Sequence, residues 1–173
     1  MARYGASIVS QATQLSNVPA TTTVNGYLGY WGSSATAGFR LRRLQLGTFI
    51  LAGGVPTSQQ VSVGIYRQTV SPSGTGIAAA VPGQPYETHT LQTDPTAGLF
   101  AITATTIGTT GPTLATNPIT VIPFNTQSTL DLPYEFLEEL ICPLGVTNGL
   151  AFVSLSGTLP TSHQIRLNVE IEV

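Results

Sequence analysis

The residues best suited to acid–base or metal chemistry are few and scattered. The two histidines, His89 and His163, stand far apart in the sequence. Metal sites on β-barrels gather several histidines and a carboxylate from neighbouring strands, whereas Glu87-Thr88-His89 supplies one of each on a single strand face. Ser162 precedes His163, but adjacency does not place its hydroxyl against the imidazole, and no Gly-x-Ser-x-Gly motif occurs. We therefore predict neither a metal site nor a hydrolytic triad.

The thiol and the acidic residues give no catalytic pattern either. Cys142 is the only cysteine, which excludes an internal disulfide, and no His or Arg flanks it to lower its pKa. Glu135, Glu138 and Glu139 crowd into one short segment, whereas glycosidases place their carboxylates on both sides of a cleft. The glycine-rich segment 108–111 lacks the lysine of a nucleotide-binding loop. The sequence therefore predicts a protein that is not an enzyme, with no catalytic residue and no cofactor.

Charge is scarce throughout the chain of 173 residues. Charged residues make up 8%, with six basic residues, all of them arginine, eight acidic residues and a net charge of −2. No basic block is present to neutralise phosphates, and no apolar stretch is long enough to cross a membrane, so we expect neither nucleic acid nor a membrane as a partner. The segment 1–7 has no apolar signal-peptide region. A surface this poor in charge is typical of a subunit that works in an assembly.

Period-two alternation predicts strands. In 165–173 every odd position is apolar and every even one polar, and 61–65 repeats the pattern. Along 39–46 the alternation changes phase, which predicts a β-bulge near Arg42 and Arg43. We expect Glu170 and Glu172 to point away from the core. The side chains expected to share that core are Leu41, Val61, Val63, Ile65, Leu167, Val169 and Ile171.

The fold class follows from these strands and from the Pro and Gly turns between them. Weaker strands are predicted in 86–91, 99–105, 119–122, 126–132 and 139–142, and a stronger one in 150–155. We predict an all-β fold, an antiparallel, jelly-roll-like β-sandwich of about eight strands. Asn148-Gly149 and Asn25-Gly26 are expected to close tight hairpins, and 131–137 is the only segment that favours a helical turn. Residues 1–35 lack sustained periodicity and are predicted to form an extended N-terminal arm, with the sandwich domain in 36–173.

Two groups of residues are candidates for an interface. The aromatic residues Tyr27, Tyr30 and Trp31 lie where the predicted arm meets the core, and tyrosine and tryptophan are preferred interface anchors. The alternative is that Trp31 seals one end of the sandwich. The second group, Arg40, Arg42 and Arg43, holds half of the positive charge and suits bidentate pairing with a partner's carboxylates. Alternatively, these arginines pair with the chain's own Glu170 or Glu172.

Several motifs bear a likeness to one protein family. They are Leu41-Arg42-Arg43-Leu44, Pro56-Thr57-Ser58-Gln59-Gln60-Val61, Phe124-Asn125-Thr126-Gln127-Ser128, Leu132-Pro133-Tyr134-Glu135 and Asn148-Gly149-Leu150-Ala151-Phe152. Together, from Phe39 to Val173, the chain resembles small β-sandwich virion proteins of tailed bacteriophages.

The resemblance implies a capsid decoration (cement) protein, made in the host cytoplasm and located on the virion surface. Such a protein binds the outer shell and stabilises it by clamping neighbouring capsid subunits. Its implied partners are the major capsid protein and itself, as a homotrimer. The alternative is a minor tail or receptor-binding module that recognises a host surface glycan through its tyrosine and tryptophan side chains.

Overall fold

The structure is a computed structural model, and every element of regular secondary structure in its described part is a β-strand. The described residues are 3–9, 27–32, 38–70, 80–82, 84–85, 99–102, 113–135, 137–145, 147–155, 159–160 and 162–173. The strands are β1 (Arg3–Val9), β2 (Tyr27–Gly32), β3 (Phe39–Ile50), β4 (Gln60–Val70), β5 (Ala80–Pro82), β6 (Gln84–Pro85), β7 (Leu99–Ile102), β8 (Thr113–Leu114), β9 (Thr120–Asn125), β10 (Leu130–Pro133), β11 (Leu140–Cys142), β12 (Gly149–Ser154) and β13 (His163–Glu172).

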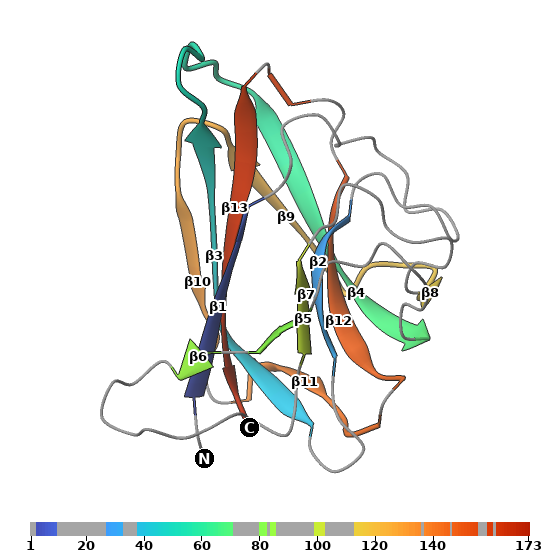
Figure 1. Ribbon diagram of the computed structural model, residues 1–173. Helices are drawn as coiled ribbons and strands as arrows, with labels where there is room; N and C mark the ends of the chain where they lie inside the picture. The colour runs from blue at the N-terminus through green and yellow to red at the C-terminus, as the bar shows by residue number, and fades with distance from the viewer. Residues whose placement is uncertain are drawn as a thin grey trace.

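The strands form two antiparallel sheets that face each other (Figure 1). In the first sheet the order is β10-β3-β13-β1-β6, and β11 also pairs with β3. In the second sheet the order is β5-β7-β2-β12-β4-β8, and β9 also pairs with β4. The predicted all-β, antiparallel fold is confirmed as a β-sandwich, while the jelly-roll connectivity stays a prediction.

The core lies between the sheets and is built by the predicted alternation. In β13 the odd-numbered residues Ile165, Leu167, Val169 and Ile171 are at most 2% exposed. All seven residues predicted for the shared core belong to one buried cluster, which also takes in Phe152 of β12. Removing such a side chain from water contributes roughly 1.5–3 kcal/mol, so this cluster is the main source of the fold's stability.

A β-bulge lies where the change of phase predicted it. Glu170 of β13 pairs with Arg43, and the next residue, Ile171, pairs with Leu41, so Arg42 is the extra residue in β3. Because of this extra residue, Leu41 and Leu44 both point into the core although they are three positions apart. The bulge thus places Arg42 and Arg43 side by side outside the core.

Two segments of the predicted N-terminal arm are strands within the sheets. β1 pairs with β13 along its whole length and with β6 on its other side. β2 lies between β12 and β7. Pairing satisfies the backbone hydrogen-bonding groups of both strands. The irregular side-chain pattern of residues 1–35 did not predict this pairing. For these two segments the arm prediction is corrected, and residues 1–2, 10–26 and 33–35 lie outside the described residues.

Two local predictions were wrong. Residues 131–133 belong to β10 and not to a helical turn, because pairing with β3 packs Leu130 and Leu132 against the core. Asn148-Gly149 does not close a hairpin, since β11 and β12 belong to different sheets. Instead, the Asn148 side chain donates to the Leu144 carbonyl (2.8 Å) and its backbone N–H donates to the Gly145 carbonyl (2.8 Å). The other predicted hairpin, Asn25-Gly26, lies outside the described residues.

Candidate interaction surface

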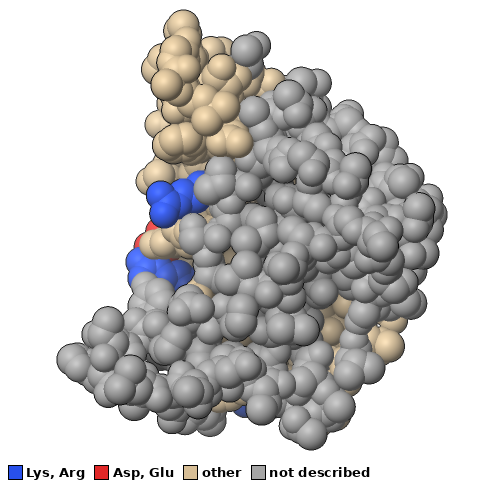
Figure 2. All heavy atoms as spheres, viewed as in Figure 1, with Lys and Arg blue, Asp and Glu red and all other residues tan. Residues whose placement is uncertain are grey.

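Charged side chains gather on the outer face of the first sheet, where Figure 2 shows basic and acidic atoms close together at one edge of the molecule. The positions follow from the strands. Pairing places Arg40 and Arg43 of β3 opposite Glu172 and Glu170 of β13, and Asp131 of β10 beside Gln45. Glu139 comes from the turn before β11, which pairs with the start of β3. In a chain with so few charges, this face holds a large share of them.

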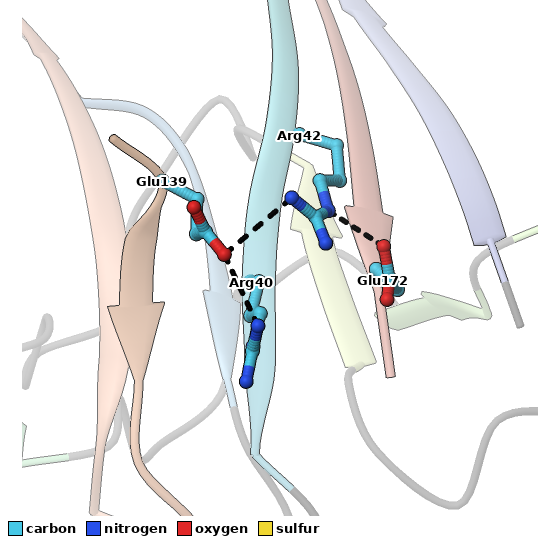
Figure 3. A network of polar contacts seen from close by, with 4 residues as sticks. All are labelled: Arg40, Arg42, Glu139 and Glu172. Atoms are coloured by element: carbon cyan, nitrogen blue, oxygen red, sulfur yellow. Dashed lines mark hydrogen bonds and ion pairs between the residues drawn. The ribbon is translucent and has the colours of Figure 1, made fainter. Parts of the chain in front are cut away.

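Arg42 is the centre of a partly buried network (Figure 3). Its Nε donates to Glu172 Oε2 at 2.6 Å, and its Nη1 lies 3.4 Å from Glu139 Oε1. Arg40 Nη1 donates to the same Glu139 oxygen at 3.1 Å. The side chains of Glu139 and Glu172 are only 2% and 9% exposed, and that of Arg42 is 14% exposed. These ion pairs are therefore largely shielded from water.

The network favours the charged form of its members. The pKa of Arg42 lies above its ordinary value, mainly because the guanidinium donates to Glu172, although burial acts in the opposite direction. The pKa of Glu139 lies below its ordinary value. Its own backbone N–H contributes most to this, burial opposes it, and the Leu137 backbone N–H and the two arginines add to it. The network is held together by full charges.

Arg43 forms a separate and more exposed pair with Asp131. Its Nε donates to Asp131 Oδ1 at 2.7 Å, and its Nη2 donates to Asp131 Oδ2, so the pair is bidentate. This hydrogen bonding holds the pKa of Asp131 below its ordinary value. Each of the predicted arginines thus has a carboxylate within its own chain. The pairing of Arg42 with Glu172 is one of the alternatives that the sequence offered, and an interface role for the three stays a prediction.

Sequence reasoning missed the part that Glu139 plays. It grouped Glu139 only with Glu135 and Glu138 and gave it no partner, whereas the Glu139 side chain is almost fully buried against Arg40 and Arg42. Arg40 and Glu139 are 99 positions apart, and they meet only because β11 pairs with β3. No local pattern in the sequence carries that information.

The backbones of the predicted aromatic anchors lie in β2. Tyr30 pairs with Ala151 of β12 and with Ala101 of β7, and Trp31 pairs with Leu150 and Phe100. The side chains of Tyr27, Tyr30 and Trp31 lie outside the described part of the structure, and their interface role stays a prediction.

Large apolar side chains are exposed at several places on the molecule. Phe49 lies at the end of β3, and Leu51 and Val55 lie on the connection to β4, where Val55 is 73% exposed. Leu137, Ile141 and Leu144 lie in and around β11, and Leu137 is 84% exposed. Ile119 precedes β9, and Val121 belongs to it. Exposed apolar groups of this size on a charge-poor protein favour burial against a partner.

The groups considered for chemistry serve the fold. His163 is fully buried, and its Nε2 accepts a hydrogen bond from the Thr57 backbone N–H at 3.3 Å. Cys142 is buried in the core. Among the described residues, no three His, Cys, Asp or Glu side chains are grouped as metal ligands would be. His89 lies outside the described residues.

Comparisons with known proteins give no relative: no family model, no curated protein and no solved structure matches the chain. Within the described residues, no helix has the length and apolar character needed to span a membrane.

Proposed function

We propose that this chain is a structural protein of a virus particle, a capsid decoration protein that binds the outer shell and clamps neighbouring subunits. The observation that carries the proposal is the set of exposed apolar side chains on a tightly packed sandwich, with Val55 and Leu137 the most exposed. Burying one such side chain against a partner contributes roughly 1.5–3 kcal/mol. The resemblance in sequence to virion proteins of tailed bacteriophages supplies the identity of that partner, the major capsid protein.

The clamp acts by mass action. A protein that binds only the assembled shell stabilises that state in proportion to the logarithm of its concentration over its dissociation constant. Under this proposal the chain has no catalytic part in the particle. A homotrimer would match closed cyclic symmetry at a shell position shared by several subunits.

The test compares particles made with and without the gene for this chain. Particles that lack the protein should assemble but release their DNA at a lower temperature, and adding the purified protein back should restore the original value. Adsorption to host cells serves as the control and should not change. Normal thermal stability combined with lost adsorption would overturn the proposal in favour of a receptor-binding tail module.

A further inference from the structure

We propose that the end of β3 and its connection to β4, residues 49–59, form the surface by which this chain attaches to its partner, and that the partner presents an uncharged apolar recess of a folded protein. We call this segment the apical loop. The inference rests on the proposed function, under which the recess belongs to the assembled shell. Three properties of the loop support it: exposure of its apolar side chains, absence of charge, and fixed shape.

The apical loop exposes apolar side chains where the molecule projects furthest. In Figure 1 it extends beyond the ends of both sheets, at the top of the view. Phe49 is 49% exposed, Leu51 is 38% exposed and Val55 is 73% exposed. Side chains that project in this way can enter a recess without a clash between the bodies of the two proteins. Apolar anchors in pockets carry most of the free energy of many interfaces.

The described segments around this loop contain no charged residue, and the first charged residue in register is Arg166, which pairs with Gly47. No Asp, Glu, Lys or Arg occurs in 44–66, which contains the loop, or in 113–130 and 159–165, which contribute its neighbours. The one histidine in these segments, His163, is fully buried. A charged partner surface would lose its hydration here and find no opposite charge in return. Charge complementarity therefore selects a neutral, apolar partner.

Hydrogen bonds from two other parts of the fold, residues 162–163 and Thr126, hold the loop in shape. At its start, the Leu51 backbone N–H donates to the Ser162 carbonyl at 2.9 Å. Near its end, the Thr57 backbone N–H donates to His163 Nε2. The buried Thr126 hydroxyl donates to the Thr57 carbonyl at 2.5 Å and accepts from the Gln59 N–H at 2.9 Å.

Glycine is required inside the loop for the same shape. Gly53 has φ +85°, and a Cβ on Gly54 would come within 2.6 Å of Ile50 Cγ2 and 2.8 Å of Ser162 Cβ. A loop fixed in this way loses little conformational entropy on binding. That advantage matters for a partner with a shape of its own, such as a protein recess, and much less for a fluid lipid layer.

The exposed apolar residues near β11 serve as the internal comparison. Leu137, Ile141 and Leu144 are at least as exposed as Phe49, but the charged residues Glu135, Glu138 and Arg40 lie next to them in sequence or in register. Among the described residues, Ile119 and Val121 are also exposed within an uncharged segment, but the apical loop is the segment that extends beyond the ends of both sheets (Figure 1).

The experiment measures binding of the purified protein to particles that lack it. The test variant is the double substitution Phe49→Ser and Val55→Ser, and the matched control is Leu144→Ser, an equally exposed apolar residue at the other end. We expect the double variant to bind at least about tenfold more weakly and the control to bind as the original protein does. Binding of the original protein should hardly change between about 50 and 500 mM salt. Thermal unfolding of each variant checks that the sandwich is intact.

The outcomes separate the inference from the proposed function. If the original protein does not bind the particles, the proposed function fails. If it binds and the double variant binds equally well, the apical loop is not the attachment surface, although the proposed function stands. A strong loss of binding at high salt would overturn the uncharged recess. Binding to phosphatidylcholine vesicles that the double variant loses would overturn a protein partner in favour of a membrane.

A second variant tests the fixed shape by itself. Thr126→Val keeps the apolar side chains of the loop and removes the hydroxyl that bridges Thr57 and Gln59. We expect binding to weaken severalfold, because the loop then loses more conformational freedom when it docks. Unchanged binding by this variant in its folded form would overturn the argument from pre-organisation.

Discussion

The two ends of β3 use their surface in opposite ways. At its start, Arg40, Arg42 and Arg43 all meet carboxylates of the same chain. At its end, Phe49 and the apical loop present apolar side chains to solvent with no charged residue nearby in sequence. The ion pairs at this end join β3 to β13, to β10 and to the turn before β11. The comparison indicates that the uncharged surface at the end of β3 is better suited to a partner than the charged surface at its start, where the charges already pair within the chain.

The contrast depends on β13 having one side that faces the core and one that faces outward. The largest effect on folding is expected when a charge is placed on the side that faces the core. Val169→Asp places an unpaired charge among fully buried side chains, so we expect the protein not to fold. Arg166→Asp, on the exposed side of the same strand, should fold. Far-UV circular dichroism and size-exclusion chromatography compare the two. A soluble, folded Val169→Asp protein would contradict the assignment of the core.

The second largest effect on stability is expected for the shielded network of ion pairs at the start of β3. Arg42→Ala leaves the buried carboxylates of Glu139 and Glu172 without their shared partner, and we expect it to lower the free energy of unfolding by about 2 kcal/mol. Arg43→Ala breaks a solvent-exposed pair and should have a smaller effect. Urea unfolding at neutral pH measures both. Equal losses would mean that burial does not distinguish the two pairs.

Acid should weaken the charged end selectively. The pKa values of Glu139 and Asp131 are depressed in the folded protein, so the unfolded chain binds more protons as the pH falls below about 5. Stability gained from these carboxylates is complete above their unfolded pKa values and is lost as the pH falls through the folded values. Melting temperatures between pH 7 and about pH 3 should therefore decline, and less steeply for Glu139→Gln. An identical slope in that variant would exclude Glu139 as a contributor.

The smallest effect on stability is expected at the apical loop. Val55→Ser removes a side chain that is 73% exposed and should change the free energy of unfolding by no more than about 0.5 kcal/mol, whereas Phe49 is half-buried and Phe49→Ser should lower it by about 1 kcal/mol. Urea unfolding again provides the measurement. A loss as large as that of Arg42→Ala would show that the loop contributes to the fold and is not reserved for a partner.

Sequence patterns predicted those parts of the fold in which the alternation of apolar and polar residues within one strand shows which face is buried. The alternation in β13 and β4 identified the core residues, and the change of phase in β3 located the bulge at Arg42. Wherever the outcome depended on a distant strand, the same reasoning failed. Arg3–Val9 pairs with β13, which no local periodicity indicated. The helical turn predicted over 131–137 was wrong because 131–133 pair with β3, although the strand predicted in 126–132 overlaps β10.

The candidate surface shows the same limit. Arg42 could be matched with Glu172 from the sequence because β3 and β13 were both recognised as strands. Glu139 could not be matched with Arg40, since β11 has only three residues and its pairing partner is far away in the chain. The fixed shape of the apical loop could not be predicted from the sequence, because His163 and Thr126, which hold it, are distant in the chain.

The pairing of β1 with β13 determines at which end of the sandwich a peptide or domain joined to the chain would lie. Arg3 stands opposite Glu172, so the two strand ends lie together, and Figure 1 shows them at the end of the molecule away from the apical loop. At about 3.3 Å per residue, the length of β13 sets roughly 30 Å between that end and the loop. A peptide or domain joined at either terminus would therefore face outward from a particle on which the loop is docked. Under the proposed docking, the apical loop would bind the carrier, and the end with the strand termini would stay accessible for display.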